Sequence, residues 1–155
     1  MIKVAVSGAM GRLGSVIAMG VTNTEDMQLS HVYDPLHAGA VIAGMEIETG
    51  IEMVDAEIVV ECTHPDVVME NLEWWHTQSK SVVVGTSGFS AERIEQVKSF
   101  WVNPSTSCLI VPNFSIGAVL MMRFAAGAAA LMPSAEIIEL HHDKKLDAPS
   151  GTAAR

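Results

Sequence analysis

The stretch VAVSGAMGRLGSVI, residues 4–17, decides the fold. It joins the end of a strand expected at 2–6 to the start of a helix expected at 12–21. Gly8, Gly11 and Gly14 lie three residues apart at this junction. Glycines in this position permit a tight turn and close approach of the backbone to a pyrophosphate, and the helix N-terminus attracts the phosphate charge. The pattern favours a dinucleotide-binding turn.

An acidic residue follows at the expected distance. A second strand, residues 28–33, ends at Asp34, 20 residues after Gly14. Such a side chain can accept hydrogen bonds from an adenosine ribose. The first glycine interval differs by one residue from the commonest fingerprint, so the alternative is a glycine-rich connection with an ordinary aspartate. The Asp34 carboxylate should repel a 2′-phosphate and favours NADH, whereas Arg12 could receive that phosphate, which keeps NADPH open.

The rest of the chain alternates strands with helices. This alternation predicts right-handed βαβ units and an α/β fold with a Rossmann-type doubly wound parallel sheet. Glycines interrupt the segment 36–54, which is expected to be a loop with marginal strands. The further strands are expected at 57–62, 81–88, 108–113 and 134–143, and the further helices at 64–79, 90–101 and 116–132.

Composition excludes several classes of protein. The chain has 155 residues, 49% of them hydrophobic, and a net charge of -9, so general attraction to nucleic acid or anionic lipid is not expected. Cys62 and Cys108 lie in apolar runs, which favours a reduced cytoplasmic protein. The apolar run 116–132 contains Arg123 and is too short to cross a membrane, so it is expected to be a buried helix. The N-terminus does not resemble a signal peptide, and no metal site is expected.

Small polar turns follow three of the later strands. They are CTHP at 62–65, GTSG at 85–88 and PNFS at 112–115. Each alone is ordinary loop chemistry. In an open parallel sheet, however, ligands gather outside the carboxyl ends of the strands. Together with the glycine turn, these ends predict a cleft.

The closing stretch ELHHDKKLDAPSGTAAR, residues 139–155, carries a second constellation. Three of the chain's nine Lys and Arg residues lie in its last twelve positions. They follow an apolar segment and flank a PSGT turn whose backbone N–H groups can bind an anion. For any single residue here a solvated loop is the simpler interpretation, but together they predict a local anion site on an acidic protein.

These motifs resemble one known family. GAMGRLG, VGTSGF, PNFSIG and above all ELHHDKKLDAPSGTA are similar to the signatures of 4-hydroxy-tetrahydrodipicolinate reductase, also called dihydrodipicolinate reductase, of lysine and diaminopimelate biosynthesis. The resemblance implies a dinucleotide-binding domain at 1–114. It also implies that 115–155 begin a smaller α+β substrate-binding and oligomerisation domain, apparently incomplete because family members continue well past Arg155. A homotetramer is implied for the full-length protein.

The resemblance also implies an activity and its residues. Hydride would pass from NADH or NADPH to 4-hydroxy-tetrahydrodipicolinate, a small dicarboxylate, giving tetrahydrodipicolinate. Catalysis is assigned to His141 as proton donor with Lys145. The substrate would contact His142, Lys145, Ser150, Gly151 and Thr152. The implied cofactor contacts are Gly8, Ala9, Met10, Gly11, Arg12, Leu13, Asp34, Gly85, Thr86, Ser87, Val111, Pro112, Asn113 and Phe114.

Two other functions stay open at this point. Another nicotinamide-dependent reductase of amino-acid metabolism would share the glycine turn and Asp34, but has no reason to carry HHDKKLDAPSGT. A module that binds NAD without turnover is the non-enzymatic alternative.

Overall fold

A computed structural model describes residues 1–52 and 55–140 of the chain. The chain divides by its contacts into two units, Met1–Ile110 and Val111–Arg155. The first unit contains a parallel sheet of five strands in the order β2-β1-β5-β6-β7. The boundary expected between residues 114 and 115 stays a prediction.

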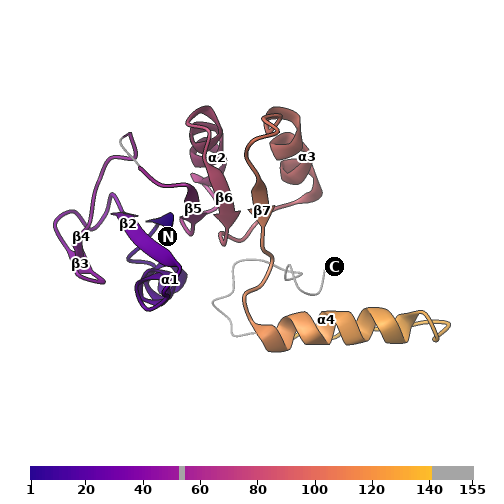
Figure 1. Ribbon diagram of the computed structural model, residues 1–155. Helices are drawn as coiled ribbons and strands as arrows, with labels where there is room; N and C mark the ends of the chain where they lie inside the picture. The colour runs from indigo at the N-terminus through magenta and orange to yellow at the C-terminus, as the bar shows by residue number, and fades with distance from the viewer. Residues whose placement is uncertain (53–54, 141–155) are drawn as a thin grey trace. The chain divides into compact units, whose positions relative to one another are not determined.

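The sheet and its helices follow the predicted alternation (Figure 1). Its strands are β1 Ile2–Ser7, β2 Met27–Tyr33, β5 Ile58–Glu61, β6 Ser81–Val84 and β7 Cys108–Ile110. The helices that connect them are α1 Arg12–Thr22, α2 Val68–Thr77 and α3 Ala91–Phe100. Between β2 and β5 the predicted marginal strands form a short antiparallel hairpin, β3 Val41–Ile42 and β4 Met45–Glu46.

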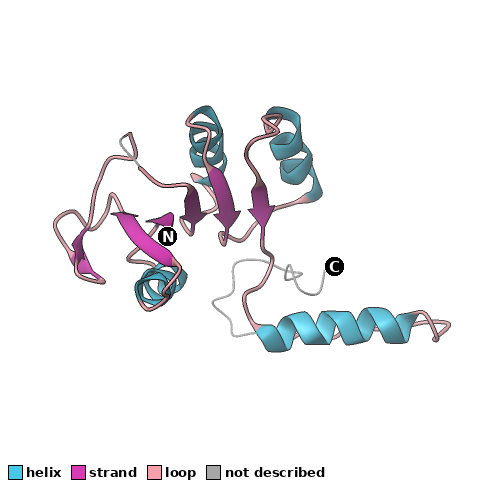
Figure 2. Ribbon diagram, viewed as in Figure 1, coloured by secondary structure: helices cyan, strands magenta, loops and turns pink. Residues whose placement is uncertain are grey.

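The two faces of the sheet carry separate apolar cores, because successive side chains of a strand point to opposite faces. Val4 and Val6 of β1 pack with Ala18 and Val21 of α1. Ala5, between them, belongs to the cluster that contains residues of α2 and α3. Figure 2 shows α1 on one side of the sheet and α2 and α3 on the other. The sheet is therefore doubly wound, as predicted.

The carboxyl ends of the strands lie side by side. Ser7 of β1 pairs with Tyr33 of β2 on one side and with Glu61 of β5 on the other. Glu61 pairs with Val84 of β6, which pairs with Ile110 of β7. The polar turns that follow these strands consequently start from one edge of the sheet. The order of the strands reverses between β1 and β5, which is the switch point where such folds bind ligands.

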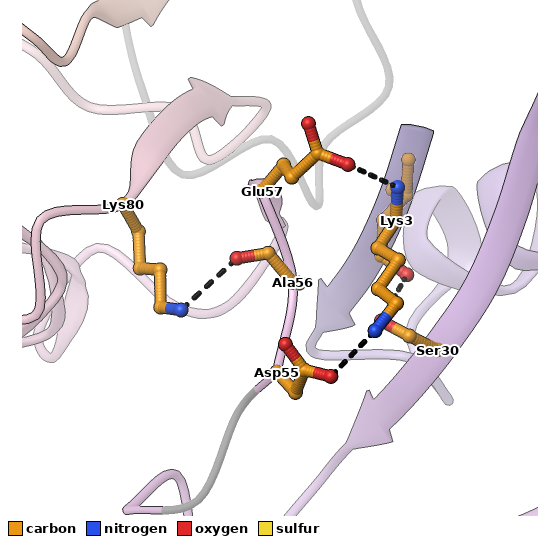
Figure 3. Close-up of polar contacts among 7 residues, drawn as sticks. Lys3, Ser30, Asp55, Ala56, Glu57 and Lys80 are labelled. Atoms are coloured by element: carbon orange, nitrogen blue, oxygen red, sulfur yellow. Dashed lines mark hydrogen bonds and ion pairs between the residues drawn. The ribbon is translucent and has the colours of Figure 1, made fainter. Parts of the chain in front are cut away.

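The opposite, amino edge is joined by polar contacts at the surface (Figure 3). Lys3 Nζ lies 2.6 Å from an Asp55 carboxylate oxygen. This hydrogen bond raises the pKa of Lys3 and lowers the pKa of Asp55. Lys80 donates to the Ala56 carbonyl oxygen at 3.0 Å. These contacts tie the segment before β5 to β1 and β6. They lie at the amino edge of the sheet and involve none of the turns at its carboxyl edge.

The second unit contains α4, Ile116–Ala129, whose first turn is capped by the Ser115 hydroxyl. A buried helix was expected here, and that expectation is wrong for the described residues, since none of the α4 residues is buried. Residues 134–140 form no strand, although a strand was expected from 134 onwards. An apolar helix or strand is covered only when another element packs on it, and the described part of this unit offers none. No helix among the described residues is long and apolar enough to cross a membrane.

Candidate dinucleotide-binding site

The glycine turn after β1 is packed too closely to admit a side chain at Gly8 or Gly14. Gly8 has φ +78°, and a Cβ there would collide with the backbone carbonyl of Cys62. A Cβ on Gly14 would collide with the Gly8 carbonyl group. The Gly8 and Ala9 N–H groups both donate to the Tyr33 carbonyl oxygen, at 2.9 and 3.1 Å. The turn is thus held between the ends of β2 and β5, and α1 starts directly against it.

The N-terminus of α1 has no side-chain cap. Gly11 is the N-cap residue and the first turn contains no acidic residue. By contrast, serine hydroxyls cap α3 and α4, accepting from Arg93 N–H and Ala118 N–H. The first N–H groups of a helix have no partner within it, so those of residues 12–14 can bind an anion. The residues present therefore fit the pyrophosphate of a dinucleotide.

Asp34 adjoins the same turn, but its carboxylate already has partners. It is buried, with 7% of its surface exposed. One oxygen accepts from the Met10 N–H at 3.2 Å, and the other accepts from the Leu36 N–H at 3.1 Å and lies 2.9 Å from His37 Nδ1. A carboxylate offers about four lone-pair positions, so a ribose hydroxyl could be added or could replace His37. Whether it binds ribose stays a prediction.

The turn after β6 connects to the end of β5. Gly85 N–H donates to the Glu61 carbonyl oxygen at 2.8 Å. The Thr86 hydroxyl lies 3.3 Å from the carbonyl oxygens of Glu61 and Thr63. Thr86 is buried, whereas Ser87 is exposed. Of these three predicted cofactor contacts, the buried Thr86 supports the neighbouring turn through its hydroxyl. Gly85 and Ser87 are at least partly exposed and could contact a ligand.

The remaining predicted residues lie outside the described part of the first unit. Val111, Pro112, Asn113 and Phe114 belong to the second unit, where the Asn113 side chain accepts from the Ser115 N–H at 2.8 Å. The predicted catalytic and substrate-binding residues lie outside the described residues. They are His141, His142, Lys145, Ser150, Gly151 and Thr152.

Sequence reasoning did not assign a role to Glu61. Its side chain is fully buried at the end of β5 and accepts from the Trp75 indole N–H at 2.8 Å. It also accepts from the Asn71 amide at 3.3 Å and from the Thr63 hydroxyl. The sequence indicates the special position of Glu61 through its place inside the apolar run IVVECT. A charged residue in a buried strand requires a specific set of hydrogen-bond donors.

The two cysteines are free thiols of low acidity. Burial, together with the Glu61 charge, raises the pKa of Cys62 to about 12. Burial raises the pKa of Cys108 to about 11. At neutral pH both are therefore protonated, and neither has the low pKa of a reactive cysteine.

Taken together, a doubly wound parallel sheet, a glycine turn at its switch point and an uncapped helix N-terminus define a Rossmann-type dinucleotide-binding domain. Comparison with known proteins narrows this class. Residues 2–114 match the family model described as "Dihydrodipicolinate reductase, N-terminus", and residues 117–155 match the one described as "Dihydrodipicolinate reductase, C-terminus". The chain belongs to the dihydrodipicolinate reductase family.

Individual relatives agree with this assignment. The chain is 49% identical over 154 residues to the 4-hydroxy-tetrahydrodipicolinate reductase of Mycobacterium marinum, covering 99% of this chain and 59% of the relative. The Cutibacterium acnes enzyme of the same name is 46% identical, with 99% and 58% covered. A dipicolinate-bound dihydrodipicolinate reductase from Paenisporosarcina sp. TG-14 has a TM-score of 0.76 at 35% identity, with 99% and 63% covered. The chain thus spans about three fifths of these proteins.

The close packing of Gly14 leads to a first prediction. Gly14→Ala should lower the free energy of unfolding by about 1–3 kcal/mol, because the new methyl group meets the Gly8 carbonyl group. Gly20→Ala, in the same helix, has open space around the new methyl group and should raise stability by about 0.5–1 kcal/mol. Urea denaturation of both variants measures the difference. Equal effects at the two positions would contradict the packing described for the glycine turn.

The raised thiol pKa values lead to a second prediction. At pH 8 only about one Cys62 thiol in ten thousand is ionised when its pKa is about 12, so the native thiol should react slowly with a disulfide reagent. Single-cysteine variants, Cys108→Ser and Cys62→Ser, allow each thiol to be timed with a chromogenic disulfide reagent. Both should react rapidly in denaturant, and Cys62 should be the slower thiol in the native protein. Immediate labelling of native Cys62 would refute its burial beside Glu61.

Proposed function

We propose that this chain forms the nucleotide-binding part, and the beginning of the substrate domain, of an NADH- or NADPH-dependent 4-hydroxy-tetrahydrodipicolinate reductase. The observation that carries the proposal is the match of both halves of the chain, in order, to the two domains of this family. The uncapped N-terminus of α1 beside the glycine turn supports it, since those residues suit a dinucleotide's pyrophosphate.

The cofactor supplies the hydride when it is bound. We assign the pyrophosphate to the N–H groups at the start of α1, and the adenosine ribose to Asp34. The Met10 N–H already points to the Asp34 carboxylate, which couples these two contacts in one turn. The complete set proposed to touch the cofactor is Gly8, Ala9, Met10, Gly11, Arg12, Leu13, Asp34, Gly85, Thr86, Ser87, Val111, Pro112, Asn113 and Phe114.

The substrate side of the proposal rests on sequence. A solved relative binds dipicolinate, which supports a small cyclic dicarboxylate as the ligand. Backbone N–H groups at Gly151 and Thr152, with the Lys145 ammonium, would hold a carboxylate. His142 and Ser150 are proposed to complete this pocket. His141 would deliver the proton that completes reduction, and holding the ring in place lowers the barrier by several kcal/mol.

The cellular setting is proposed on the same basis. The activity would serve lysine and diaminopimelate biosynthesis, the pathway of the family. A homotetramer is proposed for the protein at the length of its relatives, and a cytoplasmic location agrees with two free thiols that form no disulfide.

Cofactor preference provides a third prediction. The chain should bind NADH at least as tightly as NADPH, because the Asp34 carboxylate opposes a 2′-phosphate. Asp34→Asn removes this charge and should shift the ratio of the two dissociation constants toward NADPH by about tenfold. Glu25→Gln, which removes an exposed charge in the loop before β2, is the matched control. A strong preference of the unmodified chain for NADPH would remove Asp34 from its proposed role.

Catalysis provides a fourth prediction, tested on the protein extended to the length of its relatives. His141→Ala should lower kcat by about 10²-fold to 10⁴-fold with little change in KM, because a positioned general acid acts in the transition state. Lys145→Ala should impair both constants, since it removes a charged contact to the substrate. Loss of reduced cofactor with freshly generated substrate is the assay. Tight NADH binding without any turnover would instead favour a non-catalytic NAD-binding module.

A further inference from the structure

Glu61 is a fully buried carboxylate whose donors in the described structure are all neutral. The Trp75 indole N–H donates to Oε2 at 2.8 Å. The Asn71 amide at 3.3 Å and the Thr63 hydroxyl donate to Oε1. Burying a carboxylate is unfavourable unless its lone pairs are satisfied. Each of its two oxygens therefore has its own anchor, Trp75 on one and Thr63 with Asn71 on the other.

This network determines which way the Thr63 hydroxyl points. A carboxylate only accepts hydrogen bonds, so the Thr63 hydroxyl must donate its single hydrogen to Glu61. The Asn71 amide nitrogen, 3.4 Å from Thr63 Oγ1, is a donor as well. The Thr63 hydroxyl can then take part in further hydrogen bonds only through its oxygen lone pairs. Toward any other group it is an acceptor.

Thr63 also lies at the switch point. A Cβ on Gly8 would come within 3.0 Å of the Thr63 backbone nitrogen, so this residue lies directly against the glycine turn. The Thr86 hydroxyl holds the Thr63 carbonyl oxygen from the β6 side. A dinucleotide whose adenosine half is bound near Asp34, at the end of β2, places its other half across β1 over the ends of β5 and β6.

We propose that Glu61 is a positioning residue: it holds the Thr63 hydroxyl as an acceptor for a hydrogen-bond donor on the nicotinamide half of the bound dinucleotide, a ribose hydroxyl or the carboxamide. The inference rests on the proposed function only for the binding of a dinucleotide, and it requires no turnover. Glu61 does not touch the cofactor. It acts through Thr63.

The substitution Glu61→Gln should change the Thr63 hydroxyl from a hydrogen-bond acceptor to a hydrogen-bond donor toward the ligand. The Trp75 N–H has a fixed direction, so the glutamine must turn its carbonyl oxygen toward Trp75. Its NH₂ group then faces Thr63, whose hydroxyl can rotate, and the Asn71 amide, which must turn its oxygen toward the glutamine. That hydroxyl now accepts from the glutamine and directs its hydrogen toward the ligand. The hydroxyl would then present its hydrogen where the donor of the ligand needs a lone pair, so the contact to the nicotinamide half would be weakened.

The experiment measures the dissociation constants of NADH and ADP by calorimetry with the 155-residue chain and its variants. Glu61→Gln and Thr63→Val should each weaken NADH binding by about tenfold, the effect of one hydrogen bond. Neither should change ADP binding, because ADP lacks the nicotinamide half. Thr63→Ser keeps the hydroxyl and should bind NADH like the unmodified chain. Trp75→Phe disturbs only the other oxygen, so it should lower stability but not NADH affinity.

The double variant Glu61→Gln with Trp75→Phe provides the sharpest test. Without the indole N–H, the glutamine can turn its oxygen back to Thr63, and NADH affinity should return although stability stays low. If Glu61 had only a structural role, the second substitution should lower NADH affinity further. Failure of this recovery, an unchanged affinity in Thr63→Val, or equal losses for ADP and NADH would overturn the proposal. If Glu61→Gln does not fold, the comparison of Thr63→Val with Thr63→Ser decides. If the unmodified chain does not bind NADH, the proposed function fails as well.

Discussion

The structure depends on the contact between the glycine turn and the carboxyl ends of its two neighbouring strands. Gly8 lies against the Cys62 carbonyl group, and its N–H and that of Ala9 bind the Tyr33 carbonyl oxygen. This arrangement uses the backbone groups of β2 and β5 to hold the turn. It leaves the following helix N–H groups without partners, and that is the property a phosphate site requires.

Two buried carboxylates flank this turn, Asp34 at the end of β2 and Glu61 at the end of β5. Negative charges beside a proposed pyrophosphate site would oppose binding if they were unsatisfied. The hydrogen bonds around them explain how both are accommodated: Asp34 accepts from the Met10 N–H of the turn itself, and Glu61 accepts from the Trp75 indole. Each carboxylate therefore orients groups near the site, and both oxygens of each accept hydrogen bonds.

Much of the first unit could be predicted because its signals are local. The β-branched runs at β1, β5 and β6, each followed by a glycine or a small polar turn, indicate buried parallel strands. Two expectations about the second unit were wrong, the burial of α4 and a strand in residues 134–140. An apolar composition shows that a segment can be buried. Whether another element covers it depends on the tertiary structure, which the composition does not specify.

The sequence by itself determined the order of strands and helices, the glycine turn, and the acidic residue that follows β2, because these depend on neighbours in the chain. Only the tertiary structure decided which donors surround Asp34 and Glu61, since His37, Asn71 and Trp75 reach them through turns and helices. Likewise the Thr63 hydroxyl is oriented by Glu61 at the end of β5 together with Asn71 of α2, a helix that packs on the sheet. Hydrogen-bond direction is a property of assembled neighbours, and no spacing within the chain specifies it.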